Sequence, residues 1–329
     1  MKSGPERSAK LHRRPSAPPG RRSGVLLAAR VVVTGAAGRL GRALLPVLCA
    51  HPEIGSVVAI DRAAVDFAHP KLEAVQGDIG EPAIGVRLEG AGALVNLAAV
   101  LLRGRRSEAA MRATNVGATQ ALLAEAARRR LPAIVHLSSA AVYGSGENLG
   151  EAAPLAPLRG FRYAEHKAQV EAWIAHELPR AIVLRPVAIL GPNAQPLLRR
   201  LFAAPCYLRL PDPQPRFQCV HEDDVAAAVV RALGAAHNGA VGAFNIAAPS
   251  SFTLRELATS RRPHAPAVAP GIARAMLAIG WTVARWGGEP GWHRGIEHSL
   301  TVDSSRAARV LGWRARYTDW REITGVVRA

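Results

Sequence analysis

Cysteine and aromatic residues are scarce in this 329-residue chain. Its three cysteines are Cys49, Cys206 and Cys219, and none of them are spaced as metal ligands or as a redox pair. An odd, dispersed set of three argues against a disulfide framework and favours a reducing compartment, so we expect a cytoplasmic protein. Aromatic residues make up only 5% of the chain. Zinc-finger spacing and interleaved basic and aromatic residues are absent, which argues against specific nucleic-acid binding.

The sequence also has no apolar run of the length needed to span a membrane, and we expect no metal site. Its net charge is +17, and residues 1–24 carry +6 of this, from seven basic residues and one acidic residue. Arg21-Arg22 before an apolar run resembles an export signal, but Arg30 interrupts that run. We therefore predict a flexible basic tail. The alternatives are a transit peptide and a functional chain that begins near Val25.

What the chain does have is 49% hydrophobic content, enough for a large core. Short apolar runs rich in β-branched residues alternate with segments of helical periodicity, which predicts a doubly wound, mostly parallel α/β sheet. A ligand is then expected at the carboxyl ends of the strands. The expected strands are Ala28–Thr34, Ser56–Ile60, Leu72–Gln76, Ala93–Leu97, Ala133–Leu137 and Ala181–Leu184, and the expected helices are Leu40–Ala50, Asn115–Arg130 and Phe161–Leu178.

After Pro186 the pattern loosens, and prolines punctuate the stretch up to Pro215. We therefore expect residues 25–186 to form the sheet domain. Residues 187–329 are expected to form a smaller substrate-binding region, interleaved with the last elements of that domain.

A glycine-rich turn follows the first strand and opens the first helix. Gly35, Gly38 and Gly41 are its glycines, and such a turn lets backbone amides and a helix N-terminus approach a pyrophosphate. Asp61 ends the second strand, 26 residues after Gly35, where a carboxylate can bind the adenosine ribose. Because a carboxylate repels a 2′-phosphate, NAD is favoured over NADP as the cofactor. Arg62 weakens this preference, since an arginine there can accept the phosphate.

Tyr163 and Lys167 stand four residues apart in the helix expected over Phe161–Leu178, so they share one helix face. An ammonium beside a phenol stabilises phenolate and lowers the tyrosine pKa. Such a tyrosine can exchange a proton with a substrate hydroxyl while a hydride moves to or from nicotinamide. Ser139 follows the fifth strand, at the same edge of the sheet, where its hydroxyl can hold the substrate oxygen.

These pieces together resemble the extended short-chain dehydrogenase/reductase superfamily, also called the NAD-dependent epimerase/dehydratase family. The similar segments cover about residues 29–230. In chain order they are TGAAGRLG, AIDR, QGDI, VNLAAV, TNVGAT, HLSSAAVYG, YAEHK, VLRPVAILGPN and CVHEDDVAAA. The resemblance implies a Rossmann-type fold and an NAD-dependent enzyme.

The resemblance also assigns roles to matching positions. It implies Ser139, Tyr163 and Lys167 as catalytic residues, and Ser139, Ala140 and Tyr163 as substrate contacts. The cofactor contacts that it implies are Gly35, Ala37, Gly38, Arg39, Leu40, Gly41, Asp61, Arg62, Asp78, Ile79, Leu97, Ala98, Ala99, Asn115, Tyr163, Lys167 and Pro186. Asn115 is expected to be structural or part of a proton path.

The substrate end departs from the nucleotide-sugar members of that family. Those members carry an asparagine where this chain has Ala188, and an arginine where it has Phe217. Arg216 stands one residue away and would reach a phosphate if the strand began after it. The run His221–Asp224 is interpreted as a helix cap rather than a metal site, and His166 is expected to be exposed.

We therefore expect an NAD-dependent oxidoreductase acting on a secondary alcohol or ketone, such as a sugar acid or polyol. The first alternative is a nucleotide-sugar epimerase or dehydratase, which returns the hydride to the same substrate. The second is a non-catalytic NAD-binding or scaffold protein. A small-molecule substrate and a homodimer are the expected partners. A tail that tethers the enzyme to nucleic acid or an anionic membrane is a further hypothesis.

Overall fold

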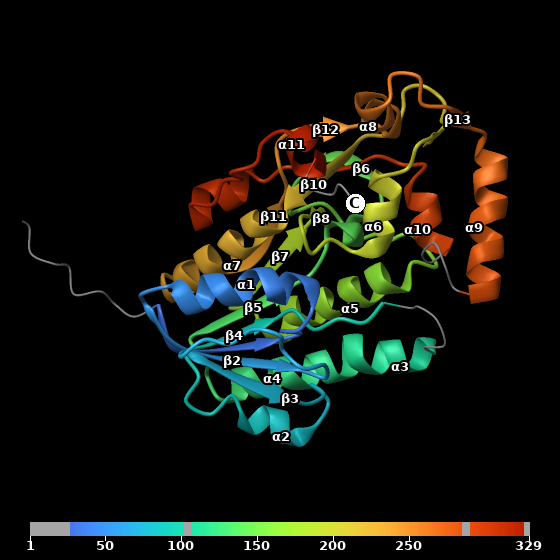
Figure 1. Cartoon of the computed structure of the whole chain (residues 1–329). Coiled ribbons are helices and arrows are strands. Elements are labelled where there is room, and N and C mark those ends of the chain that lie inside the picture. The colour runs from blue at the N-terminus through green and yellow to red at the C-terminus, as the bar shows by residue number, and fades with distance from the viewer. Residues whose placement is uncertain (1–26, 102–106, 285–289, 326–329) are drawn as a thin grey trace, which may run out of the picture.

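The structure, a computed structural model, describes residues 27–101, 107–284 and 290–325, so the basic tail expected over 1–24 lies outside it. Its centre is a sheet of seven parallel strands (Figure 1). In spatial order these are β3 (Leu72–Gln76), β2 (Ile54–Asp61), β1 (Ala28–Thr34), β4 (Ala93–Asn96), β5 (Ala133–Leu137), β7 (Ile182–Pro186) and β11 (Gly242–Ile246). This is the order of a doubly wound dinucleotide-binding sheet, and the predicted fold class is confirmed.

Helices cover both faces of this sheet (Figure 1). Helices α1 (Arg39–Ala50) and α7 (Glu222–His237) pack on one face. The other face carries α4 (Thr119–Arg128) and α5 (Arg162–Glu177), and α2 (Pro82–Val86) lies against α4. Successive residues of β1 point to opposite faces: Val31 and Val33 enter the core under α1, whereas Val32 enters the core under α4. The sheet is therefore buried on both sides, as its continuous apolar strands predict.

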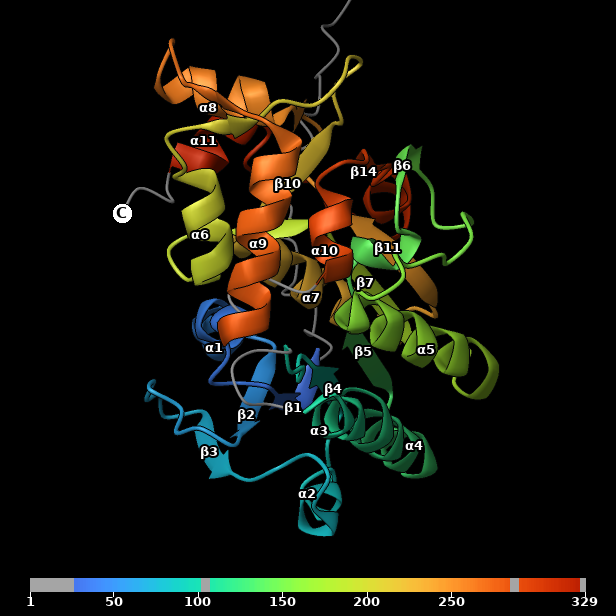
Figure 2. The same ribbon diagram turned by 90° about the vertical axis from the view of Figure 1, so that its right-hand side faces the viewer.

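A smaller sheet stands beyond the carboxyl edge of the main one, in the order β12-β10-β14-β6, with β8 paired to β10. Its strands are β12 (Ser251–Phe252), β10 (Phe217–His221), β14 (Leu300–Val302), β6 (Gly146–Leu149) and β8 (Ala188–Leu190). Figure 2 looks onto this side, where α6 and α10 lie near α9. The remaining elements are α6 (Pro196–Phe202), β9 (Tyr207–Leu208), α8 (Leu254–Arg261), β13 (Ala267–Val268), α9 (Pro270–Ala284), α10 (Pro290–Gly295), η3 (Ala307–Leu311) and α11 (Trp320–Gly325).

The main-sheet helices differ from the predictions in two places. The helix expected to begin at Asn115 begins at α3 (Glu108–Arg112) and passes through a π-helical turn, η1 (Ala113–Ala118), before α4. Ser107 caps its start by accepting a hydrogen bond from the amide of Ala110. The helix start was predicted from the apolar periodicity of later residues, and this cap was therefore missed. The prediction that His166 is exposed is wrong, because α5 packs against η1 and α4 and leaves the residue only 4% exposed.

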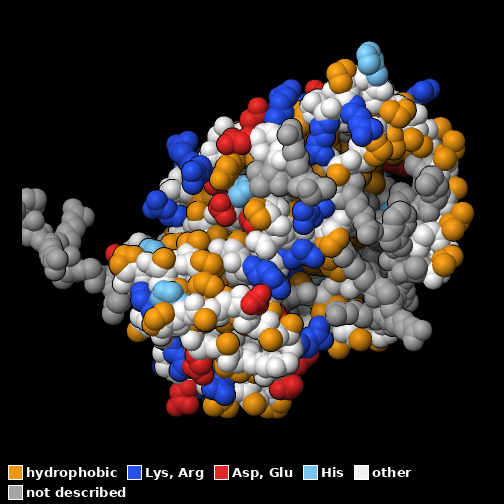
Figure 3. All heavy atoms as spheres, viewed as in Figure 1, with side chains coloured by type: hydrophobic (Ala, Val, Ile, Leu, Met, Phe, Trp, Pro, Cys, Tyr) orange, Lys and Arg blue, Asp and Glu red, His pale blue; other side chains and the backbone are white. Residues whose placement is uncertain are grey.

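Helix α9 shows an apolar face to solvent. Ile272, Ile279 and Val283 are 59%, 63% and 80% exposed, and hydrophobic side chains follow the right-hand edge of Figure 3, where α9 lies. Within the described ranges, no helix combines the length and apolar character that crossing a membrane requires. The expected homodimer stays a prediction.

Candidate active site

A cavity of about 680 Å³ opens at the carboxyl ends of the main strands. One side of it is the glycine turn, and the opposite side is made by the smaller sheet and α6. It brings together most of the residues that the sequence predicts for the site. Those that line it are Gly35, Gly38, Arg39, Leu40, Gly41, Asp61, Leu97, Ala99, Ser139, Ala140, Tyr163 and Pro186.

The glycine turn needs its glycines for steric reasons. Gly35 has a φ of +72°, and a Cβ there would lie 2.7 Å from the backbone nitrogen of Ala98. A Cβ on Gly41 would lie 2.1 Å from the carbonyl oxygen of Ala36, so this glycine lets α1 pack close to the turn. Gly38 is the N-cap of α1, whose first turn contains no acidic residue. This bare helix N-terminus beside the cavity fits a pyrophosphate.

Asp61 ties the end of β2 to the turn. One carboxylate oxygen accepts from the amide of Ala37 at 3.0 Å, and the other accepts from the amide of Ala63 at 3.0 Å. The Ala37 amide, expected to face the cofactor, is therefore engaged by Asp61. Arg62 lies 3.4 Å from the carboxylate of Asp78, so the arginine that weakened the preference for NAD is paired.

A second cavity, of about 60 Å³, adjoins the first and shares Gly35, Asp61, Ala99 and Val100 with it. Arg62, Asp78, Ile79 and Ala98 line this second cavity together with Thr114 and Val100. It thus contains Arg62, Asp78, Ile79 and Ala98, four of the cofactor contacts that the resemblance implies.

Arg39 points across the cavity mouth rather than along the turn. Its guanidinium donates to the carbonyl oxygens of Asn193 and Ala194, at 3.2 and 3.0 Å. It therefore joins the start of α1 to the segment before α6. A phosphate contact from this side chain would require it to leave those carbonyls.

Buried amides shape the segment after β4, which forms the cavity floor. Asn115 accepts from the amide of Val100 at 2.7 Å and donates to its carbonyl oxygen at 2.8 Å. Asn96 accepts from the hydroxyl of Thr34 and from the amide of Ala98, at 2.6 and 3.2 Å. Asn115 thus holds the cavity floor in place. Of the two roles expected for this residue, these hydrogen bonds fit the structural one.

Ser139 and Tyr163 face the cavity from neighbouring elements. Ser139 is the N-cap of a short 3-10 helix, η2 (Ala140–Tyr143), and its Oγ accepts from the amide of Ala141 at 3.2 Å. Tyr163 lies in the first turn of α5. Burial raises the pKa of Tyr163 to about 12. The phenol is therefore protonated at neutral pH in this structure.

Lys167 is 3% exposed and lies beneath the cavity wall. Its Nζ donates to the carbonyl oxygen of Leu137 at 2.5 Å and lies 5.9 Å from the centre of the Tyr163 ring. Burial lowers the pKa of Lys167 to about 8, although the nearby Glu171 opposes that shift. The lowering of the Tyr163 pKa that the sequence predicts is not seen, because burial raises that pKa instead.

A buried polar network beneath Ser139 was not predicted. The hydroxyl of Ser138 donates to Glu171, and Glu171 pairs with Arg185 at 2.6 Å. Arg185 also donates to the hydroxyl of Tyr143 at 2.6 Å, and Tyr143 donates to Asn245 at 2.8 Å. The network links β5, α5, β7, η2 and β11, so it fixes the loop that carries Ser139.

His136 lies in β5 and is completely buried. Its Nδ1 lies 3.1 Å from the side-chain amide of Asn96, and its Nε2 has no hydrogen-bond partner among the described residues. Burial first, and the charge of Lys167 second, hold the pKa of His136 well below its ordinary value. The ring is therefore neutral, and because Asn96 donates to Nδ1, the proton is on Nε2.

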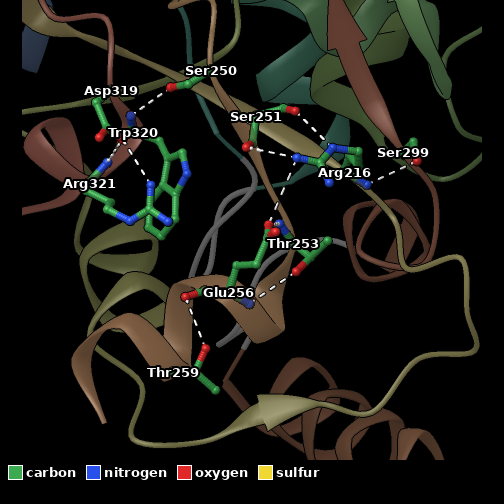
Figure 4. A network of polar contacts seen from close by, with 10 residues as sticks. All are labelled: Arg216, Ser250, Ser251, Thr253, Glu256, Thr259, Ser299, Asp319, Trp320 and Arg321. Carbon is green, nitrogen blue, oxygen red and sulfur yellow. Dashed lines mark hydrogen bonds and ion pairs between the residues drawn. The ribbon is translucent and has the colours of Figure 1, made fainter. Parts of the chain in front are cut away.

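Arg216, the basic residue predicted to contact substrate, is not part of the cavity wall. Strand β10 begins at Phe217, after Arg216, and Figure 4 shows the guanidinium turned toward Ser251 and Glu256. It donates to the hydroxyl and carbonyl oxygens of Ser251 at 2.9 and 3.1 Å. The side chain of Phe217 lines the cavity instead.

The run His221–Asp224 forms a helix cap, as predicted. His221 is the N-cap of α7 and accepts from the amide of Asp223 at 3.2 Å, and the acids fill the first turn. Asp224 also accepts from the backbone amides of Arg316 and Tyr317, at 2.9 and 3.1 Å. Across the described ranges, no cluster of His, Cys, Asp and Glu side chains is arranged to hold a metal ion.

Curated proteins with similar sequences fall into two groups. The chain is 30% identical over 247 residues to a polyketide synthase-nonribosomal peptide synthetase, ACE1 of Pyricularia oryzae, covering 64% of this chain but 6% of that protein. It is 26% identical over 307 residues to the uncharacterised protein y4nG of Sinorhizobium fredii, covering 88% of this chain and 75% of that protein. The chain thus spans only a small part of the synthetases it matches.

Solved structures share the fold at lower sequence identity. MoeE5 in complex with UDP-glucuronic acid and NAD has a TM-score of 0.68 at 21% identity, over 90% of this chain and 97% of that chain. The dTDP-glucose 4,6-dehydratase DesIV of Streptomyces venezuelae, with NAD bound, has a TM-score of 0.68 at 23% identity, over 91% and 96%. A UDP-glucose 4-epimerase has a TM-score of 0.68 at 20% identity, over 91% and 96%.

The model of the NAD-dependent epimerase/dehydratase family matches residues 31–247. That range begins in β1, contains the glycine turn and the serine, tyrosine and lysine, and ends just after β11. The resemblance predicted from the sequence is confirmed, and the NAD dependence in the family's description agrees with the predicted cofactor. The chain belongs to the NAD-dependent epimerase/dehydratase family.

Proposed function

We propose that the protein catalyses NAD-dependent hydride transfer at a secondary alcohol or ketone carbon, with Ser139, Tyr163 and Lys167 as the catalytic residues. The observation that carries this is the cavity itself, which is lined by the glycine turn, by Asp61, and by Ser139 and Tyr163. The residues expected to hold a dinucleotide and those expected to carry the chemistry therefore line one cavity.

Each residue has a defined task in the proposed reaction. Ser139 holds the substrate oxygen by a hydrogen bond. In alcohol oxidation Tyr163 has to act as the phenolate, and it takes the hydroxyl proton as the carbinol C–H bond breaks and the ketone forms. When bound, NAD would supply the hydride acceptor, and its oxidised nicotinamide carries a positive charge. In the reverse direction Tyr163 returns the proton to the oxygen. Lys167 holds the loop carbonyl of Leu137 and stabilises the phenolate.

A second candidate is a nucleotide-sugar epimerase or dehydratase, which would use the same three residues. The solved structures of the same fold include UDP-sugar and dTDP-sugar enzymes. They favour this candidate over the sugar-acid or polyol dehydrogenase expected from the sequence. Net formation of NADH separates the two, because an epimerase or dehydratase returns the hydride and leaves the cofactor unchanged.

The test is to incubate the protein and NAD with a panel of secondary alcohols, sugar acids and UDP-sugars. NADH absorbance and product analysis measure turnover. We expect at least one class to be converted, with or without net NADH. Dinucleotide binding without conversion of any class would instead favour the non-catalytic NAD-binding protein.

Asp61→Ala is expected to weaken NAD binding and to reduce the discrimination against NADP. The variant loses a carboxylate that repels a 2′-phosphate and that anchors the Ala37 amide at 3.0 Å. Loss of a hydrogen bond to a charged group corresponds to about a tenfold rise in the dissociation constant. Titration of both cofactors by calorimetry measures this, with Asp66→Ala as a control outside both cavities. An unchanged NAD-to-NADP ratio would remove Asp61 from the ribose site.

A further inference from the structure

Apolar side chains form the cavity wall on the side of the smaller sheet. They come from the segment before α5 and from α6, β10, β12 and β14: Leu158, Phe161, Phe202, Phe217, Phe252 and Leu300. The ring centres of Phe202 and Phe252 are 5.7 Å apart in an edge-to-face arrangement, and those of Phe217 and Phe252 are 6.3 Å apart. Trp320 packs behind Phe252 at 5.2 Å. Phe202 and Phe252 are only 5% and 1% exposed, so they back the wall. Leu158, Phe161, Phe217 and Leu300 are partly exposed and present the apolar surface to the cavity.

Two polar side chains on this side of the cavity already form hydrogen bonds within the protein. The amide of Gln218 donates to the carbonyl oxygen of Ala248 at 3.1 Å and accepts from the amide of Val302 at 2.8 Å. The carboxylate of Glu222 accepts from the side chain of Asn193 at 2.8 Å and from its backbone amide. Both groups hold loops together, so a ligand gains little from them.

Within the part of the chain that the structure describes, no lysine or arginine lines this side of the cavity. Among the described residues that line the cavity, Arg39 is the sole lysine or arginine, and it lies at the glycine turn with its guanidinium on two carbonyl oxygens. Arg216 is bonded to Ser251, with Glu256 4.0 Å away (Figure 4). A diphosphate brought against the aromatic wall would lose its hydration without gaining a paired cation, which is costly.

We infer that the substrate presents an apolar arm to this wall, so that it is a secondary alcohol or ketone with an alkyl, alicyclic or aromatic substituent rather than a nucleoside diphosphate sugar. This rests on the hydride transfer proposed above. The reacting oxygen lies at Ser139 and Tyr163. The arm lies along the partly exposed Phe217 and Leu300, with Phe252 packed against Phe217.

A series of alkan-2-ols from propan-2-ol to octan-2-ol tests the inference. If each added methylene leaves water for the aromatic wall, kcat/KM for NADH formation rises about three- to fourfold per methylene. Phe217→Arg should raise KM for octan-2-ol by about tenfold or more, whereas Phe217→Leu keeps the dependence on chain length. Val86→Arg, on an exposed residue of α2, is the control for added charge. A kcat/KM that does not vary with chain length overturns the apolar arm.

A binding measurement separates this inference from the proposed chemistry. Tyr163→Phe saturated with NAD is titrated with octan-2-ol and with UDP by calorimetry. Binding of octan-2-ol with a negative heat-capacity change, and no binding of UDP, supports the apolar arm. Tighter binding of UDP overturns it and leaves hydride transfer intact. Binding of octan-2-ol, with no conversion of any alcohol or UDP-sugar by the wild type, instead overturns the proposed function.

Discussion

Tyr163→Phe is expected to lower turnover by about 10²- to 10⁴-fold, the usual contribution of a positioned general acid or base, while changing NAD affinity far less. The substitution removes one hydroxyl from the cavity wall and keeps the ring that packs at the start of α5. Because burial raises the pKa of Tyr163 to about 12, the hydroxyl is a proton donor at neutral pH. Because the substitution leaves the equilibrium constant of the reaction unchanged, kcat/KM should fall by the same factor for ketone reduction and alcohol oxidation at any one pH.

Steady-state rates and NAD titrations of the two proteins measure this. Tyr207→Phe removes the same hydroxyl from β9, outside the residues that line the cavity, and should change neither quantity. If the turnover of Tyr163→Phe stays within about tenfold of wild type, another group must be the general acid or base. Ser139 is the next candidate, since its Oγ faces the same cavity.

The cofactor end of the cavity was predictable because its signals are local. Gly35, Gly38 and Gly41 lie within one strand-to-helix turn, and Asp61 ends the neighbouring strand. A Cβ on Gly35 or Gly41 would lie 2.7 or 2.1 Å from backbone atoms of Ala98 or Ala36. Glycine is therefore required at both positions, and the sequence shows it directly. Parallel pairing of β1 with β2 then brings Asp61 to the turn, where it accepts from Ala37.

The support beneath Ser139 was not predictable, because its partners are far apart in sequence. Tyr143 reaches Asn245 across 102 positions, and Arg185 reaches Tyr143 across 42. Neither pairing follows a helical or strand period. Arg185 lies in an apolar strand, where a buried arginine is costly without a partner. Its presence was the one available signal that a buried acid such as Glu171 had to lie nearby.

The burial of Lys167 could not be predicted from the sequence either. Its i+4 spacing from Tyr163 fixed the shared helix face, but not the packing of α5 that leaves it 3% exposed. Burial reverses the expected balance, since it raises the tyrosine pKa and lowers the lysine pKa. Spacing thus predicted which groups are neighbours, whereas desolvation set their proton affinities.

Lys167→Met is expected to be less active and more stable than the wild type. Turnover should fall by about two orders of magnitude, as when one preorganised electrostatic donor is removed. The lysine pKa is lowered from 10.5 to about 8 by burial, so keeping the charge in the folded state costs about 3 kcal/mol at neutral pH. The lost hydrogen bond to Leu137 costs about 1 kcal/mol. A net gain of about 2 kcal/mol in the free energy of unfolding follows.

The pH dependence of that gain distinguishes a relieved buried charge from better packing. Between pH 8 and 10.5 the unfolded wild type holds more protons at this position than the folded one, so the wild type becomes more stable as pH rises. The advantage of Lys167→Met should therefore be constant below pH 8 and shrink steadily above it. Urea unfolding of both proteins from pH 7 to 10 measures the difference, in which shifts common to both, such as that of Cys219, cancel.

Lys71→Met is the matched control, because Lys71 donates to the carbonyl oxygens of His51 and Ile54 at 2.9 and 2.7 Å and lies far from the catalytic residues in sequence. It should keep turnover and be no more stable than the wild type. A Lys167→Met protein that is less stable than the wild type at pH 7 would mean that the ammonium is well solvated or paired in the folded state. Lys167 would then be a residue that the fold needs, whereas a stabilised and inactive variant identifies a charge kept in the core for the reaction.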